Sequence, residues 1–287
     1  MAKKVARRVP SHAWRHIFIF VLMLFALFPI YTVIIASLGD SGTLTSASLL
    51  PNKITLFNYR KLFTDQSMPF MRWVVNSLTL GIFNAVISVL IGLLASYAFS
   101  RLRFKGRKLS LQILLLVQVF PNFLAIAAIY VIMERIYNVF PAIGIGTTWG
   151  LLLVYLGGSM GANAWLLKGF LDSIPMELDE AAKIDGASPA QIFWLIFAPL
   201  TKPIIVVTAL LTFIGTFNEF VLASIFLQEV NARTIAVGLQ SFVGASFGQN
   251  WGAFAAGSVL AAVPLVTLFL SLQKYIIGGV AAGSVKG

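Results

Sequence analysis

The sequence of 287 residues contains no cysteine, which excludes disulfide bonds, thiolate catalysis and metal sites with cysteine ligands. Charged residues are also scarce: they form 11% of the chain, where soluble domains have about 25%. Hydrophobic residues make up 59% of the chain, and its mean hydropathy is +0.89. This composition predicts an all-α integral membrane protein.

Groups for catalysis or metal binding are mostly missing. The two histidines, His12 and His16, are four positions apart, but no third ligand lies near them, so no metal site is predicted. The apolar segments contain no pair of carboxylates. The chain has no HExxH motif and no Gly-Lys dipeptide, which the phosphate-binding loop of ATPases requires. We therefore expect no catalytic residue and no cofactor on this chain, and an intramembrane enzyme finds no candidate residues.

About six apolar runs are long enough, at about 20 residues each, to cross a membrane. Between them, residues 100–108 contain five basic residues in nine positions, whereas residues 134–146 contain one. Because short cytoplasmic loops are enriched in Lys and Arg, this asymmetry predicts that both termini lie in the cytoplasm. The same bias explains the net charge of +11, so we expect a lipid bilayer and no nucleic acid as partner. The runs cover residues 17–37, 73–99, 109–133, 147–171, 203–227 and 252–277.

The runs divide the chain into five predicted parts. In order, these are a cytoplasmic segment (1–16), a peripheral first transmembrane helix (17–37), an extracytoplasmic loop with short helical pieces (38–72), a transmembrane core (73–277) and a cytoplasmic tail (278–287). By its place between two predicted spans, the polar stretch 177–203 falls in the cytoplasm.

This polar stretch predicts a short helix, a tight stop and a second helix. Gly186 suits a left-handed C-terminal cap, and Ser188 with Gln191 resembles a capping box that starts the second helix. Between the caps, Ala181 and Ala182 would form a smooth face where the backbone of another protein could approach closely. The stretch is therefore interpreted as a docking element for a cytoplasmic partner.

A possible transport pathway rests on a few polar residues inside the apolar runs. Glu219, beside Asn218, lies in the middle of the fifth run, where a carboxylate is costly and should face a cavity or a partner. It either belongs to the pathway, contacting substrate or sensing protons, or pairs with a neighbouring helix or subunit. Asn163 and Gln118 are further pathway candidates, because neutral polar groups beside aromatic rings suit a sugar, although such amides also join helices.

The polar stretch resembles the EAA loop of ABC-importer permeases. Other segments, at residues 97–106, 118–121, 155–158, 230–242 and 281–287, look like the second permease subunit of carbohydrate importers, and most like the maltose/maltodextrin branch. The resemblance covers nearly the whole chain. In the loop (172–203) it is carried by Glu180, Ala181, Ala182, Asp185, Gly186, Ala187 and Pro199.

This resemblance implies the type I importer fold in a bacterial inner (cytoplasmic) membrane. It also implies a homologous second permease subunit, two copies of an ATPase that binds ATP and Mg, and an extracytoplasmic solute-binding protein. The EAA loop would couple ATP hydrolysis to passage of an oligosaccharide, and the C-terminal tail could also reach the ATPase. Maltodextrin is the first choice of cargo; galacto-oligosaccharide, trehalose and glycerol phosphate stay open. A self-contained secondary transporter is the alternative that Glu219 favours.

Overall fold

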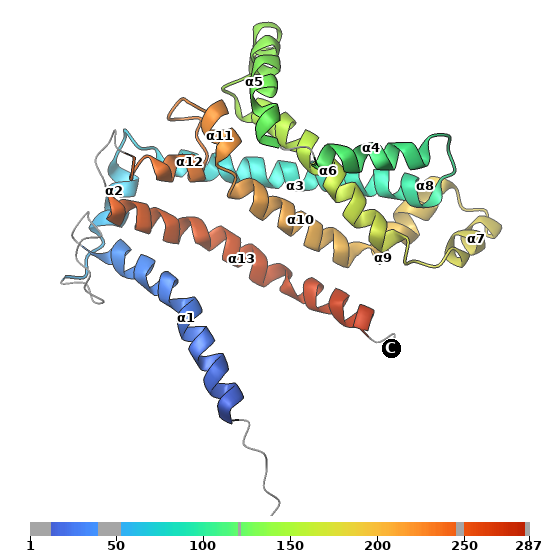
Figure 1. Ribbon diagram of the computed structural model, residues 1–287, viewed down its shortest axis with the longest axis horizontal. Coiled ribbons are helices and arrows are strands. Elements are labelled where there is room, and N and C mark those ends of the chain that lie inside the picture. Colours follow the sequence, from blue (N-terminus) through green and yellow to red (C-terminus); the bar gives the residue numbers. More distant parts are fainter. Residues whose placement is uncertain (1–12, 40–52, 120–121, 245–249, 285–287) are drawn as a thin grey trace, which may run out of the picture. The chain divides into compact units, whose positions relative to one another are not determined.

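The computed structural model describes residues 13–39, 53–119, 122–244 and 250–284, and every element within these ranges is helical (Figure 1). The chain forms two compact units. One contains Met1–Thr64 and Phe242–Val259, and the other contains Asp65–Ser241 and Leu260–Gly287. Most of the predicted cytoplasmic segment (1–16) and the last three residues of the predicted tail lie outside the described ranges.

The first unit contains α1 (Ala13–Leu38), α2 (Phe57–Thr64) and the start of α13 (Trp251–Ser284). Asn58 of α2 is buried, and its Nδ2 donates to the carbonyl oxygens of Ser37 at 3.1 Å and Gly39 at 2.8 Å. The Ser37 and Tyr59 hydroxyls are 2.8 Å apart. These bonds fasten α2, a short helix of the kind predicted for the first loop, to the end of α1.

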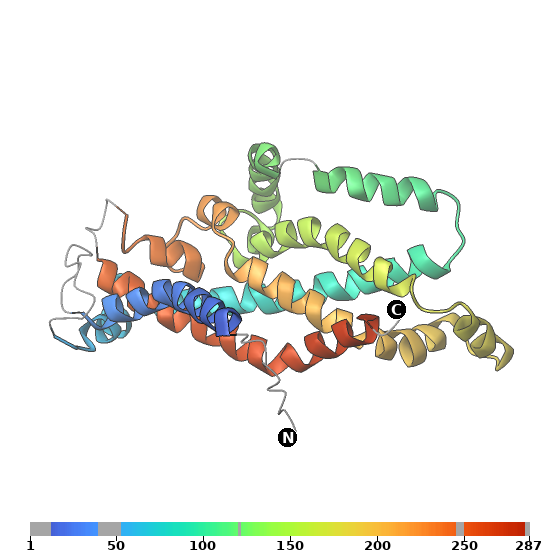
Figure 2. The ribbon, with the colours of Figure 1, turned by 60° about the horizontal axis from the view of Figure 1, so that its bottom comes forward.

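Three long helices form the centre of the second unit: α3 (Phe70–Arg101), α6 (Thr148–Leu171) and α10 (Lys202–Phe217). They lie side by side, with the contact between α3 and α6 the most extensive (Figures 1 and 2). Gly92 permits this approach, because a Cβ atom there would stand 2.9 Å from Cβ of Asn163. Since lipid tails are as apolar as leucine, close packing of this kind is a main source of cohesion between helices in a membrane.

Shorter elements complete the second unit. They include α4 (Arg107–Val119), α5 (Asn122–Val139), η1 (Pro141–Ile143), α11 (Val221–Phe226) and α12 (Ile235–Gln240). Hydrogen bonds tie the segment between α11 and α12 to the start of α3: Nε1 of Trp73 donates to the Val230 carbonyl at 2.7 Å, and Ser77 accepts from the Ile235 N–H at 2.7 Å. The α12 end of the unit is thereby fixed, opposite the end that carries α7 (Glu177–Ile184) in both views (Figures 1 and 2).

Within the described residues, α1, α3, α6 and α13 are each long and apolar enough to cross a membrane. Two further pairs, α4 with α5 and the segment Pro189–Leu200 with α10, would give up to six spans if each counts as one broken span. The predicted fifth span at 203–227 is wrong as one continuous helix, because α10 ends at Phe217 and α11 begins at Val221. The last helix continues to Ser284, beyond the predicted end of its span at Ile277.

Candidate functional site

The helix α7 is closed at its C-terminal end by the turn that the sequence predicts. Gly186 adopts a φ of +81°, its N–H donates to the Lys183 carbonyl at 3.1 Å, and the Ala187 N–H donates to the Ala182 carbonyl at 3.0 Å. This pair of bonds is a Schellman motif, in which the left-handed residue is usually glycine. Directly afterwards, the predicted capping box of Ser188 and Gln191 is present. Both caps are therefore confirmed.

The predicted smooth face of α7 is wrong. Ala182 is 7% exposed and packs inward with Tyr97 and Ile192, whereas Ala181 is exposed. Consecutive residues do not share a helix face, since each advances by about 100° around the axis. The outer side of α7 and its turn instead carries Glu180, Ala181, Asp185, Gly186 and Ile184, whose exposure reaches 86%.

After this turn, the chain returns to the bundle as one helical segment, Pro189–Leu200. It consists of α8 (Pro189–Gln191), a π-helical stretch η2 (Ile192–Phe197) and α9 (Ala198–Leu200). Phe193 and Phe197 are buried, with ring centroids 5.1 and 5.3 Å from that of Tyr97 on α3. The chain then turns by 73° into α10. Pro199, predicted as part of the docking element, lies exposed on α9.

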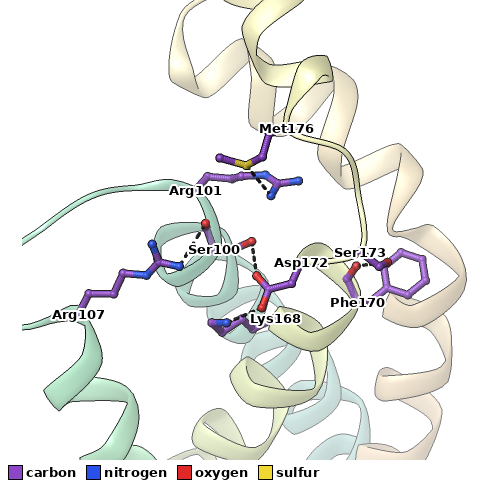
Figure 3. A network of polar contacts seen from close by, with 8 residues as sticks. All are labelled: Ser100, Arg101, Arg107, Lys168, Phe170, Asp172, Ser173 and Met176. Carbon is purple, nitrogen blue, oxygen red and sulfur yellow. Dashed lines mark hydrogen bonds and ion pairs between the residues drawn. The ribbon is translucent and has the colours of Figure 1, made fainter.

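Arg101, the last residue of α3, holds α7 against the bundle. Its Nε lies 2.9 Å from Oδ2 of Asp179, and both side chains are 6% exposed. One of its other nitrogens donates to the Met176 sulfur at 3.1 Å (Figure 3). The other donates to the Ile174 carbonyl at 2.6 Å. Its guanidinium also lies 4.8 Å from the centre of the Phe197 ring. Burial raises the pKa of the Asp179 carboxyl, and the positive charge of Arg101 acts in the opposite direction.

A second polar contact joins the ends of α3 and α6. Ser100 donates to Oδ1 of Asp172 at 2.7 Å, and the Lys168 ammonium lies 2.5 Å from the other carboxylate oxygen (Figure 3). Partial burial opposes ionisation of Asp172, but the hydrogen bonds from Lys168 and Ser100 lower its pKa below the ordinary value. The end of the bundle that bears α7 is therefore held by two neighbouring residues of α3.

A cavity of about 980 Å³ lies among α3, α4, α5, α6, α10 and the start of α11. Its apolar walls come mainly from leucine, valine and isoleucine side chains, and its polar groups are mostly amides and hydroxyls. The predicted pathway residues Asn163 and Glu219 line it. Gln118 and Asn218 do not: Gln118 is exposed and donates to the Gly158 carbonyl at 3.3 Å, and Asn218 donates to the Ile214 carbonyl at 3.0 Å.

Glu219 lies in the break between α10 and α11 rather than in the middle of a helix. Its carboxylate accepts the Tyr155 hydroxyl at 2.5 Å and the N–H groups of Leu222 and Ala223 at 2.8 and 3.0 Å. The side chain thus occupies the N-terminal end of α11, where otherwise unpaired N–H groups favour an anion. These bonds explain why the helix opens here although the hydropathy is continuous.

Hydroxyl and amide groups along the cavity bond to one another across the three central helices. Asn84 of α3 donates to Thr216 of α10 at 2.7 Å and accepts from Ser159 of α6 at 3.1 Å. Asn163 donates to Ser88 at 3.0 Å, and Thr212 donates to Asn163 at 3.3 Å. Sequence reasoning passed over the threonines of α10, although their spacing of four positions could have indicated a polar stripe: Thr208, Thr212 and Thr216.

Long apolar helices around a cavity with amide and hydroxyl groups in its walls indicate a multi-pass membrane protein. The chain belongs to the family described as "Binding-protein-dependent transport system inner membrane component", which matches residues 88–281. It is accordingly a component of the inner membrane in a system that depends on a binding protein.

Full-length relatives are permease proteins. The "Galactooligosaccharides transport system permease protein GanQ" of Bacillus subtilis (strain 168) is 38% identical over 288 residues, covering 100% of both chains. The "Maltose/maltodextrin transport system permease protein MalG" is 35% identical over 301 residues in Vibrio parahaemolyticus, with 100% of both chains covered. In Escherichia coli (strain K12), MalG is 34% identical over 285 residues, with 95% of each chain covered.

Solved structures show the same fold at lower identity. A bacterial ABC transporter involved in the import of the acidic polysaccharide alginate contains a chain with a TM-score of 0.77 at 22% identity, covering 92% of this chain and 95% of that chain. The MetNI methionine ABC transporter gives a TM-score of 0.53 at 20% identity, with 73% and 93% covered. The fold is therefore that of the type I ABC-importer permeases.

Proposed function

We propose that this chain is a permease subunit of an ABC importer for a neutral oligosaccharide. In this proposal it forms half of the translocation pathway, and a homologous permease subunit forms the other half. The names of the full-length relatives support a carbohydrate cargo. Amide and hydroxyl groups in the cavity suit a ligand that presents many hydroxyl groups and apolar C–H faces.

The observation that carries the proposal is the form of α7. Its inner side is fastened to α3 by Arg101, whereas its outer side, including Ile184, is free to meet a partner. The basic loop 100–108 begins at the same end of the bundle, which favours a cytoplasmic position for α7 by the positive-inside rule. The partner is a dimer of ATPase subunits, which binds ATP and Mg and moves α7 as it closes. An extracytoplasmic binding protein delivers the sugar at the α12 end.

Maltodextrin is the first candidate cargo, and galacto-oligosaccharide is the second because GanQ is 38% identical over its whole length. Calorimetry on the cognate binding protein with maltotriose and with a β-linked galactotriose distinguishes them. Micromolar affinity for maltotriose alone supports the first candidate, and the reverse result replaces it with the second.

Reconstitution in proteoliposomes with all partner subunits tests the role of α7. Glu180→Lys and Ile184→Glu change exposed side chains, so the bundle should fold while ATP-driven uptake and retention of the ATPase are lost. Glu177→Gln, also on an exposed side chain of α7, serves as the milder control. ATP-driven uptake at the wild-type rate in both test variants contradicts the docking role. Gradient-driven uptake by this chain alone contradicts the importer.

A further inference from the structure

The polar contacts of Arg101 lead toward the docking helix. The residue ends α3, and its three side-chain nitrogens contact the Ile174 carbonyl, the Met176 sulfur and the carboxylate of Asp179. The first two partners lie in the connection that leads into α7, and the third lies on its inner face. One buried side chain therefore joins α3 to an element more than 70 residues away in the sequence.

The character of this contact differs from that of the neighbouring ion pair. Lys168 and Asp172 are four residues apart at the end of α6, and their side chains are 14% and 43% exposed. Exposed ion pairs of this kind contribute little to the stability of the fold, because solvent screens their attraction. Arg101 and Asp179, by contrast, are both 6% exposed, so removing either charge leaves the other buried without its counter-ion.

The contact between Arg101 and Asp179 is an ion pair rather than a hydrogen bond. Although Nε of Arg101 lies 2.9 Å from Asp179, it makes no hydrogen bond within the described chain, and neither does Oδ1 of that carboxylate. The contact is therefore mainly coulombic, and it changes more gently with angle than a directional hydrogen bond does. A displacement of α7 therefore acts on α3 through this charge attraction and through the two hydrogen bonds that Arg101 donates to Ile174 and Met176.

The other end of this connection is the cavity. Helix α3 runs without interruption from Phe70 to Arg101, and its Asn84 both lines the cavity and bonds to α6 and α10. We propose that Arg101 is a positioning residue that transmits displacement of α7 into α3, and so connects the ATPase to the cavity. The proposal rests on the proposed importer function.

The test compares coupling in the fully assembled complex in proteoliposomes. Arg101→Lys keeps the charge but cannot make all three contacts, and Asp179→Asn removes the counter-ion. Both should retain the ATPase and hydrolyse ATP, while sugar uptake per ATP falls about tenfold. Arg101→Lys loses charge-assisted hydrogen bonds to Ile174 and Met176, and Asp179→Asn loses the ion pair. Asp179→Glu, which retains the charge, should recover part of the ratio. Lys168→Gln is the matched control and should keep the wild-type ratio.

Two results overturn the inference. In the first, uptake per ATP is unchanged in Arg101→Lys and Asp179→Asn. In the second, both variants lose the ATPase and uptake together, which means that the pair only supports the fold. Failure of the proposed function is distinguishable, because the wild-type complex would then show no ATP-driven uptake.

Discussion

Replacement of Gly186 by alanine should weaken transport by straining the turn that ends α7. At its φ of +81°, a Cβ atom would meet no atom within 4 Å, so the cost is conformational and not steric. The left-handed conformation costs an ordinary residue about 1–2 kcal/mol. This energy corresponds to roughly a 5- to 30-fold fall in the equilibrium ratio of the native turn to its other conformations. If docking needs this turn, the initial rate of uptake should fall, by at most that factor.

A series of substitutions at the same position gives an internal scale. Gly186→Asn should cost less than alanine, because asparagine tolerates the left-handed region. Gly186→Pro should cost most, because proline fixes φ near −65° and removes the N–H that donates to the Lys183 carbonyl. The expected order of uptake is therefore glycine, asparagine, alanine, proline.

Gly106 provides a matched control for this series. It has a φ of +88°, and a Cβ atom there would likewise meet no atom within 4 Å, but it lies in the turn between α3 and α4. Gly106→Ala should lower the thermal stability of the purified complex as much as Gly186→Ala, yet leave ATP-driven uptake per complex near the wild-type rate. Equal losses of uptake in the two variants, or normal uptake in a destabilised Gly186→Ala, would refute the reasoning.

Three further predictions concern the bundle. Glu219→Gln replaces one accepting oxygen by a donor, so it should lower the stability of the complex by about 1–2 kcal/mol, measured by thermal unfolding, and leave the range of transported sugars unchanged. Gly92→Ala should cost about 1–3 kcal/mol by forcing α3 from α6, whereas Gly157→Ala, with no atom within 4 Å, should not destabilise. Because the folded-state pKa of Asp172 is lowered, its small contribution to stability is present at neutral pH and is lost as the pH falls below about 4. Asp172→Asn should therefore slightly flatten the acid limb of a plot of melting temperature against pH.

Much of the local structure could be predicted from the sequence, because it depends on neighbouring residues. The turn at Gly186 and the capping box at Ser188 follow from backbone preferences within a few positions. The long apolar helices α3 and α6 follow from hydropathy, because an apolar run long enough to cross a bilayer has to form a helix there. Their boundaries differ from prediction by only a few residues for this reason.

The remaining features depend on residues that are distant in the sequence. In the sequence, Arg101 was only one of the basic residues that indicate a cytoplasmic loop. Its contact with Asp179, 78 positions later, is formed by the fold and could not be predicted from that charge pattern. The inward turn of Asp179 together with Ala182, three positions on, could have been inferred from helix geometry. The break at Glu219 could not have been inferred in this way, because apolar residues continue on both sides of it. The groups that donate to its carboxylate are the Tyr155 hydroxyl and a backbone N–H at the start of α11.

The distribution of charge around the cavity leads to one last prediction, about the cargo. In the described part of the chain, Glu219 is the one charged residue that lines the cavity, and its oxygens are already occupied by Tyr155 and the start of α11. An anionic cargo would therefore find no free counter-ion among the described residues that line this cavity. An unpaired charge in apolar surroundings costs several kcal/mol.

A neutral sugar does not carry this cost of an unpaired charge, because its hydroxyl groups can form hydrogen bonds with Asn163, Thr212 and their neighbours. Excess glycerol phosphate should accordingly not compete with maltotriose for uptake by the complete complex. Thr212→Val, which removes one hydroxyl and nearly preserves volume, should slow uptake of a neutral sugar by about fivefold, the effect of one ordinary hydrogen bond. Competition by glycerol phosphate at equimolar concentration would show that the pathway takes its electrostatic character from the partner permease and not from this cavity.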